Sequence, residues 1–168
     1  AKLVVDRGAA AQSTFPAGGI YLDISGNQLR GVRELRIANT QFSFTSLPGL
    51  PISCAYAYYQ SLDGRTNVIG PQDGYGWIPS IVETNNVWLD GAYSDLLTSY
   101  GGRIPKLPNP NNQDNVLDWM GIGAIASFGT VNEPCNYLEK FPDPLMGFYY
   151  ARGFTIGEAY SMAVEAPY

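Results

Sequence analysis

The stretch GIYLDISGNQLRGVRELRIANTQFSFTSLPGLPISCAYAYY, residues 19–59, decides the fold class. It opens with a short apolar run rich in β-formers over residues 19–24, which is typical of a buried strand. Residues 29–38 place apolar side chains, Leu35 among them, near helical spacing with three arginines opposite, and this predicts a surface helix. A second β-rich run covers residues 51–59. Strands that alternate with helices predict an α/β layer fold with a mostly parallel sheet.

The rest of the chain continues this alternation. Helices are predicted over residues 1–12, 91–100, 116–120, 144–151 and 155–164, and further strands over residues 66–69 and 121–130. The last of these strands is rich in small residues and is expected to be central. Asp143 before Pro144 predicts one helix start, and the capping box from Thr155 to Glu158 predicts another. Because the chain has no internal repeat or linker, we expect one domain over residues 1–168. Its opening, AKLVVDRGAAA, reads like the middle of a helix and suggests a processed piece of a longer chain.

Composition excludes several classes of function. The chain has 168 residues, of which 45% are hydrophobic and 15% are charged, so a packed globular core is expected. The net charge of −5 makes nucleic acid an unfavourable partner. The longest apolar stretch, residues 121–129, is far shorter than the ~20 residues of a membrane span. The chain contains no histidine, which excludes a Ser-His-Asp triad, a Cys-His dyad and a histidine-ligated metal site built from this chain alone.

Five segments carry a family resemblance. They are GAYSDLLTSYGG (91–102), GAIASFGTVNEPCNYLEKFPDP (123–144), YYARGFTIGEAY (149–160), VDRGAAAQSTFPAGGIYL (5–22) and NVIG (67–70). The chain resembles exported bacterial proteins of unknown function that are related to gingipain-type cysteine peptidases. This resemblance implies a caspase-like three-layer α/β sandwich with a mostly parallel sheet of about four or more strands. It also implies an extracytoplasmic location, in the periplasm, on the cell surface or in the medium.

The resemblance also implies where a catalytic dyad would lie. In the caspase-like fold a histidine follows the third strand and a cysteine follows the fourth, both at the carboxyl end of the sheet. The cysteine position falls on Cys135, the candidate nucleophile. The family's run is similar to G-A-x-x-D-H-L-T-S-x-G-G, and here Leu96 stands at the position of the missing histidine. Leucine cannot accept a proton, and the neighbouring Asp95 disfavours a thiolate. We therefore expect a pseudo-peptidase that acts as a structural or protein-binding module, with a partner protein or copies of itself as partner.

Two alternatives stay open. One is a cysteine peptidase-type hydrolase that uses Cys135 with a base supplied from elsewhere. The other is a fragment of a larger enzyme whose chemistry lies outside these residues. No cofactor is expected, since the Gly-rich loop at residues 70–76 lacks the phosphate-binding pattern GxxxxGK[ST].

Acidic and amide side chains offer only a weak metal site. Asp63, Asn67 and Asp73 lie in Gly-rich loops and are weak Ca²⁺ candidates, but they do not match an EF-hand loop, so no metal is expected. Glu133 and Asp143 could form a carboxylate pair. We expect them to cap turns or helices instead.

Aromatic residues gather on and after the predicted strand at residues 51–59, where they could form a binding surface. They are Tyr56, Tyr58, Tyr59, Tyr75 and Trp77. Alternating aromatics on a strand more often pack in the core and at its rim, and packing is the expected role here.

The two cysteines are not expected to form an intramolecular disulfide. In the caspase-like strand order two strands separate the strand of Cys54 from the strand before Cys135, a gap of ~14 Å. Disulfide-bonded Cα atoms lie within ~7 Å of each other.

Overall fold

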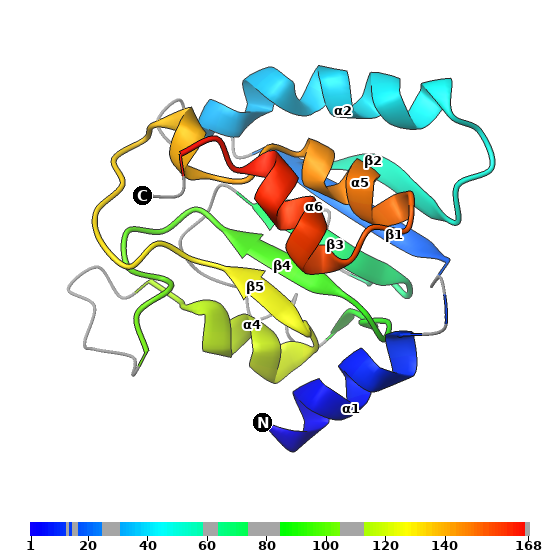
Figure 1. Ribbon diagram of the computed structural model, residues 1–168, viewed down its shortest axis with the longest axis horizontal. Helices are drawn as coiled ribbons and strands as arrows, with labels where there is room; N and C mark the ends of the chain where they lie inside the picture. The colour runs from blue at the N-terminus through cyan, green and yellow to red at the C-terminus, as the bar shows by residue number, and fades with distance from the viewer. Residues whose placement is uncertain are drawn as a thin grey trace.

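The computed structural model describes residues 1–12, 14, 17–24, 31–58, 64–73, 85–104 and 113–166, without the side chains of residues 23, 24, 56–58, 73 and 96. Its centre is a sheet in which every pair of neighbouring strands is parallel. The strands are β1 (Gly18–Ile24), β2 (Ile52–Tyr58), β3 (Val68–Asp73), β4 (Tyr93–Leu96) and β5 (Ala126–Phe128). They lie in the order β2-β1-β3-β4-β5 (Figure 1).

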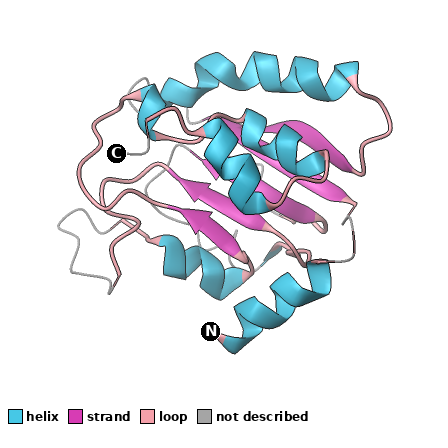
Figure 2. Ribbon diagram, in the orientation of Figure 1, coloured by secondary structure: helices cyan, strands magenta, loops and turns pink. Residues whose placement is uncertain are grey.

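Helices cover both faces of this sheet (Figure 2). One face carries α2 (Glu34–Ser46), α5 (Leu145–Ala151) and α6 (Ile156–Ala163), and the other carries α4 (Val116–Ile122). Two short 3₁₀ turns, η1 (Gly31–Arg33) and η3 (Leu138–Lys140), precede α2 and α5. α1 (Lys2–Ala11) lies at the end of the sheet where the strands begin (Figure 1). The chain is therefore a three-layer α/β sandwich with a parallel sheet, as a caspase-like fold requires.

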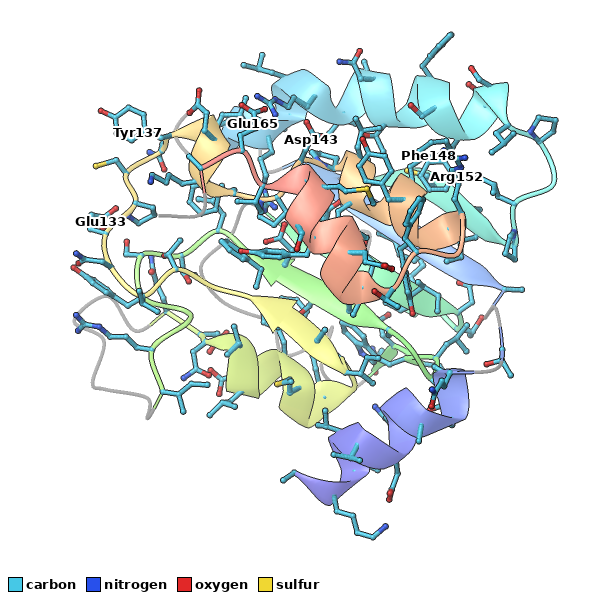
Figure 3. All side chains as sticks on the ribbon, viewed as in Figure 1. Glu133, Tyr137, Asp143, Phe148, Arg152 and Glu165 are labelled. Atoms are coloured by element: carbon cyan, nitrogen blue, oxygen red, sulfur yellow. The ribbon has the colours of Figure 1, made fainter. Side chains whose placement is uncertain are left out.

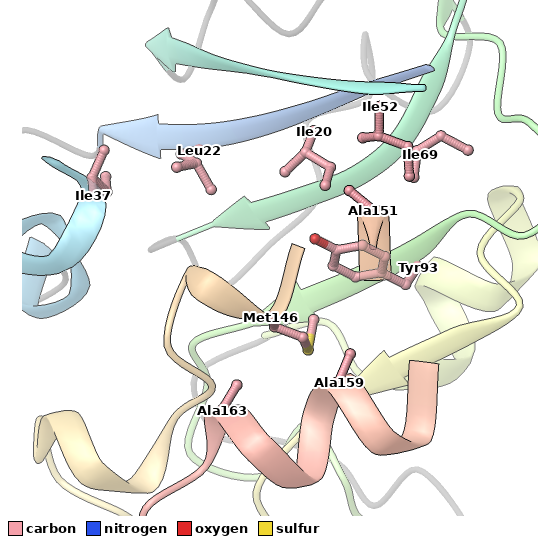
Figure 4. Packing of buried hydrophobic residues seen from close by; sticks show 10 residues of the cluster. All are labelled: Ile20, Leu22, Ile37, Ile52, Ile69, Tyr93, Met146, Ala151, Ala159 and Ala163. Carbon is pink, nitrogen blue, oxygen red and sulfur yellow. The ribbon is translucent and has the colours of Figure 1, made fainter. Parts of the chain in front are cut away.

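Each face of the sheet has its own core because neighbouring strand residues point to opposite sides. Beneath α2, α5 and α6, ten buried residues pack together (Figure 4). They are Ile20, Leu22, Ile37, Ile52, Ile69, Tyr93, Met146, Ala151, Ala159 and Ala163. On the other face, Trp119 of α4 packs edge-on against Trp88, with ring centroids 5.8 Å apart.

The segment at residues 91–100 is not the predicted helix. It contains β4, and its residues 91–95, 97 and 98 are buried. A strand that is covered on both faces loses the alternation that identifies a strand in sequence, so the short apolar run was compatible with either structure.

The predicted central strand at residues 121–130 is also wrong in part. α4 extends to Ile122, and the strand is only Ala126–Phe128. It pairs with β4 and forms one edge of the described sheet. Gly123 ends the helix at a positive φ of 148°, which explains how helix and strand share one Gly-rich run.

The predicted face of the helix at residues 29–38 is reversed at two positions. Leu35, expected inside, is 83% exposed, whereas Arg33, expected outside, is buried. η1 breaks the helical period just before α2, and Arg33 turns inward to meet Asp95. The helix itself runs on to Ser46, well past the predicted end.

Within the described residues, no helix is both long and apolar enough to cross a membrane.

Candidate functional site

A pocket of about 160 Å³ opens at the carboxyl end of β4 and β5. It is lined by Leu97, Thr98, Ser99, Gln113, Glu133, Pro134, Cys135, Asn136 and Phe141. Leu96 is the last residue of β4, and Cys135 lies in the loop after β5, so the two positions singled out in the sequence come to one end of the sheet. The resemblance placed these two positions after the third and the fourth strand. In the structure Leu96 ends the fourth strand and Cys135 follows the fifth, because residues 93–96, predicted as part of a helix, form the additional strand β4.

Cys135 sits at the tip of a tight turn on the exposed side of this pocket. Its φ of 52° lies in the left-handed region, and Cys135 is the only residue other than glycine with a positive φ in the described part of the chain. The backbone N–H of Cys135 donates a hydrogen bond of 2.9 Å to Oε1 of Glu133. Figure 3 shows Glu133 and Tyr137 on this loop, outside the helical layers. The hydrogen bond to Glu133 helps to hold this backbone conformation, which residues other than glycine seldom adopt.

The two acidic residues predicted to act as caps do so separately. Glu133 caps the turn at Cys135, whereas Asp143 accepts a 2.9 Å hydrogen bond from the backbone N–H of Leu145 at the start of α5. The helix begins at Leu145, one residue later than predicted. Asp143 also accepts a 2.9 Å hydrogen bond from Nη1 of Arg36, which in turn contacts Glu165. Each carboxylate is therefore engaged in a cap of its own.

The inner wall of the pocket is polar. The side chain of Gln113 is buried, and its Oε1 accepts a 3.3 Å hydrogen bond from the backbone N–H of Ser99. Thr98 is 2% exposed, and its Oγ1 has no hydrogen-bond partner within the described structure. A buried hydroxyl without a hydrogen-bond partner is uncommon in a folded protein.

Behind the pocket lies a buried ion pair. Nη1 of Arg33 contacts Oδ2 of Asp95, and both side chains are almost fully buried. The same Oδ2 accepts a 3.3 Å hydrogen bond from Nε2 of Gln72 on β3. The Arg33 guanidinium also lies 5.9 Å from the ring of Phe141, which lines the pocket. The carboxylate next to the expected histidine position is therefore neutralised inside the protein and does not line the pocket.

Cys54 lies far across the sheet from Cys135. β2, which carries Cys54, and β5 are at opposite edges of the described sheet with three strands between them. No disulfide joins them, as expected, although three strands rather than the predicted two lie between β2 and β5. Burial raises the pKa of the Cys54 thiol to about 12.

This raised pKa makes stability fall at alkaline pH. In the unfolded chain Cys54 ionises near its ordinary pKa of 9.0, whereas the folded protein keeps the proton until about 12. The contribution of the Cys54 thiol to the free energy of unfolding is complete below about pH 9 and is lost as the pH rises towards 12. Urea unfolding at about pH 8 and about pH 11 should show wild type losing more stability between the two than Cys54→Ala. An equal loss in both proteins would contradict the assignment.

The weak Ca²⁺ site is not tested, because only one of its three candidate side chains, that of Asn67, is described. Asn67 Oδ1 accepts a 2.8 Å hydrogen bond from the Tyr21 hydroxyl, so this oxygen is engaged. Asp63 and the side chain of Asp73 lie outside the described residues. A search of the described residues for three or more His, Cys, Asp or Glu that could hold a metal finds none.

The predicted packing of the aromatic cluster after residue 51 is not tested. Tyr59, Tyr75 and Trp77 lie outside the described residues, as do the side chains of Tyr56 and Tyr58.

Sequence reasoning missed three residues of the site: Arg33, Thr98 and Gln113. Arg33 gave a misleading signal, since it is one of three arginines placed on the solvent side of a helix. Thr98 and Gln113 are brought together by loops that approach only in the folded chain. Nothing in their local sequence marks them.

Comparisons with family models, with curated proteins and with solved structures find no match for this chain.

Proposed function

We propose that this chain is a pseudo-peptidase domain, related to the gingipain-type cysteine peptidases, that acts outside the cytoplasm as a protein-binding or structural module. The proposal rests on one observation: among the described residues, the only possible base beside the cysteine at the expected nucleophile position is the Glu133 carboxylate, and it is bound to the backbone N–H of Cys135. Leu96 stands where the resemblance requires histidine, and the adjacent Asp95 is turned inward and paired with Arg33.

The groups around Cys135 favour binding over catalysis. Among the described residues that line the pocket, Glu133 is the only titratable one besides Cys135, and its carboxylate already holds the backbone N–H of Cys135. A negative carboxylate does not stabilise a second negative charge on sulfur. The other polar residues of the lining can hydrogen-bond but cannot take a proton from a thiol near neutral pH. They are Thr98, Ser99, Gln113 and Asn136. General base catalysis is worth about 10²–10⁴-fold in rate, so its loss leaves a poor enzyme.

The test is the rate at which iodoacetamide alkylates Cys135 in the folded protein as the pH is varied. We expect slow alkylation near neutral pH, no faster than that of an unstructured peptide of the same local sequence. Cys54 is the internal control, because burial keeps it protonated and it should react only after unfolding. A rate that has already reached its plateau near neutral pH would overturn the proposal in favour of a working cysteine hydrolase.

A further inference from the structure

A pocket of about 440 Å³ lies at the end of the sheet where the strands begin, opposite the pocket of Cys135. α1 forms one side of it, and the turn between α5 and α6, with Phe154, forms another (Figure 1). Ile52, the first residue of β2, and Ile125, just before β5, line it from the sheet. Binding sites for small organic molecules have volumes of about 300–1,000 Å³, so this pocket has room for one.

α1 leaves this space open instead of filling it. None of its residues is buried, and those that line the pocket include the small residues Gly8, Ala9 and Ala11. A glycine inside a helix destabilises that helix relative to alanine. An alanine would nevertheless fit at position 8, because an added Cβ would meet only Cδ1 of Ile125 outside the helix, at 4.0 Å. Packing against the rest of the chain therefore does not account for the missing side chain.

The chemistry of the lining fits an uncharged molecule with an apolar body. None of the thirteen described residues that line the pocket is charged, so a buried ion would lose its hydration and find no counter-ion. The hydroxyls of Thr14, Tyr150 and Thr155 already form hydrogen bonds within the chain. The remaining polar side chain, that of Gln12, is exposed and makes no hydrogen bond within the described structure. Its amide can therefore meet one polar group of a ligand.

The size of the pocket favours a small molecule over a protein partner. A helix with its side chains is about 10–12 Å across, so a volume of about 440 Å³ would hold only about one turn of it. Each side of a stable protein interface contributes about 20–30 residues, whereas thirteen described residues line this pocket. An apolar cavity of about 150 Å³ already binds benzene. This pocket can therefore enclose most of a molecule larger than benzene.

We infer that this pocket binds a small uncharged amphiphile, such as a medium-chain alcohol or amide. The apolar body of the ligand lies between α1 and the turn after α5, in contact with Ile125 and Phe154, and its polar head meets the Gln12 amide. Because α1 buries none of its own residues, it can move outward to admit the ligand without opening either core. The inference goes beyond the proposed function, since it uses neither Cys135 nor the carboxyl end of the sheet.

The first experiment is a fluorescence titration with N-phenyl-1-naphthylamine, an uncharged dye that brightens in apolar surroundings. We expect one saturable site per chain, from which octan-1-ol displaces the dye. Gly8→Leu places a side chain in the pocket and Phe154→Ala removes apolar contact, so each should weaken dye binding about tenfold or more. Ala10→Leu is the matched control, because Ala10 is exposed on α1 and does not line the pocket, and it should leave dye binding unchanged. Circular dichroism checks that all three variants are folded.

Two further measurements test the class of the ligand and its place. Octanoate should displace the dye about tenfold less well than octan-1-ol, because its carboxylate finds no cation in the lining. Saturating octan-1-ol should slow hydrogen exchange of the α1 backbone amides several-fold and leave that of the α2 amides unchanged.

Four results would overturn the inference: no saturable dye binding, wild-type dye affinity in both Gly8→Leu and Phe154→Ala, equal displacement by octanoate and octan-1-ol, or hydrogen exchange that slows elsewhere than in α1. None of the three substituted positions lines the pocket of Cys135. The alkylation rate of Cys135 therefore tests the proposed function separately.

Discussion

Replacing Arg33 by methionine should lower the free energy of unfolding by about 3–5 kcal/mol. Methionine keeps the aliphatic bulk of the side chain but leaves the fully buried carboxylate of Asp95 without its cation. Gln72 donates only one hydrogen bond to Asp95, and Oδ1 of Asp95 has no partner in the described structure. A buried charge that loses its partner keeps its desolvation penalty, which is why the loss exceeds the net value of the pair.

Two further variants separate this effect from simple loss of packing. Adding Asp95→Asn to Arg33→Met removes the orphaned charge and should restore about 1–3 kcal/mol. Arg36→Met is the matched control. It also breaks ion pairs, with Asp143 and Glu165, but these lie near the surface, so about 1 kcal/mol or less is expected. Urea unfolding measures all four proteins. If Arg33→Met lowered the free energy of unfolding no more than Arg36→Met, the buried carboxylate of Asp95 would not depend on Arg33 for its stabilisation.

The elements that could be predicted from sequence are those with local signals. The capping box at Thr155 is confirmed on both sides: Thr155 Oγ1 accepts from the N–H of Glu158, and Oε2 of Glu158 accepts from the N–H of Thr155. The strands at residues 19–24 and 51–59 were placed within one residue of β1 and β2. These features depend on neighbours in the chain, so the sequence window contains all the needed information.

The elements that could not be predicted depend on contacts across the fold. β4 is recognisable as a strand only because β3 and β5 pair with it on both sides. Arg33 is inward because Asp95, sixty-two residues later, is buried beneath it. For the same reason the positions of Leu96 and Cys135 could be named from a resemblance, whereas the polar wall formed by Thr98 and Gln113 could not.

The loop after β4, which carries Thr98 of the polar pocket wall, meets the loop after β5 at a contact between two glycines. Gly102 packs directly on Gly129: a Cβ added at Gly102 would lie 2.1 Å from the carbonyl oxygen of Gly129. Thr130, the next residue, places its hydroxyl 2.6 Å from the carbonyl oxygen of Thr98 and donates to it. The backbone N–H of Gly102 donates a 2.9 Å hydrogen bond to the carbonyl oxygen of Thr130. The loop after β4 is thereby fixed against the loop that leads to Cys135.

Gly102→Ala should therefore lower the free energy of unfolding by about 1–3 kcal/mol, at the upper end of that range because the clash is with backbone atoms that cannot rotate away. Gly121→Ala is the matched control: nothing lies within 4 Å of an added Cβ there, and an alanine in α4 should stabilise the protein by about 0.5–1 kcal/mol. In urea unfolding we expect the two substitutions to change the free energy of unfolding in opposite directions, and equal changes would contradict the prediction. Because the contact sets the spacing of the two loops, Gly102→Ala should also change the alkylation rate of Cys135 in the folded protein, whereas Gly121→Ala should leave that rate as it is. If the reactivity of Cys135 did not depend on the spacing of the two loops, both folded variants would be alkylated at the same rate.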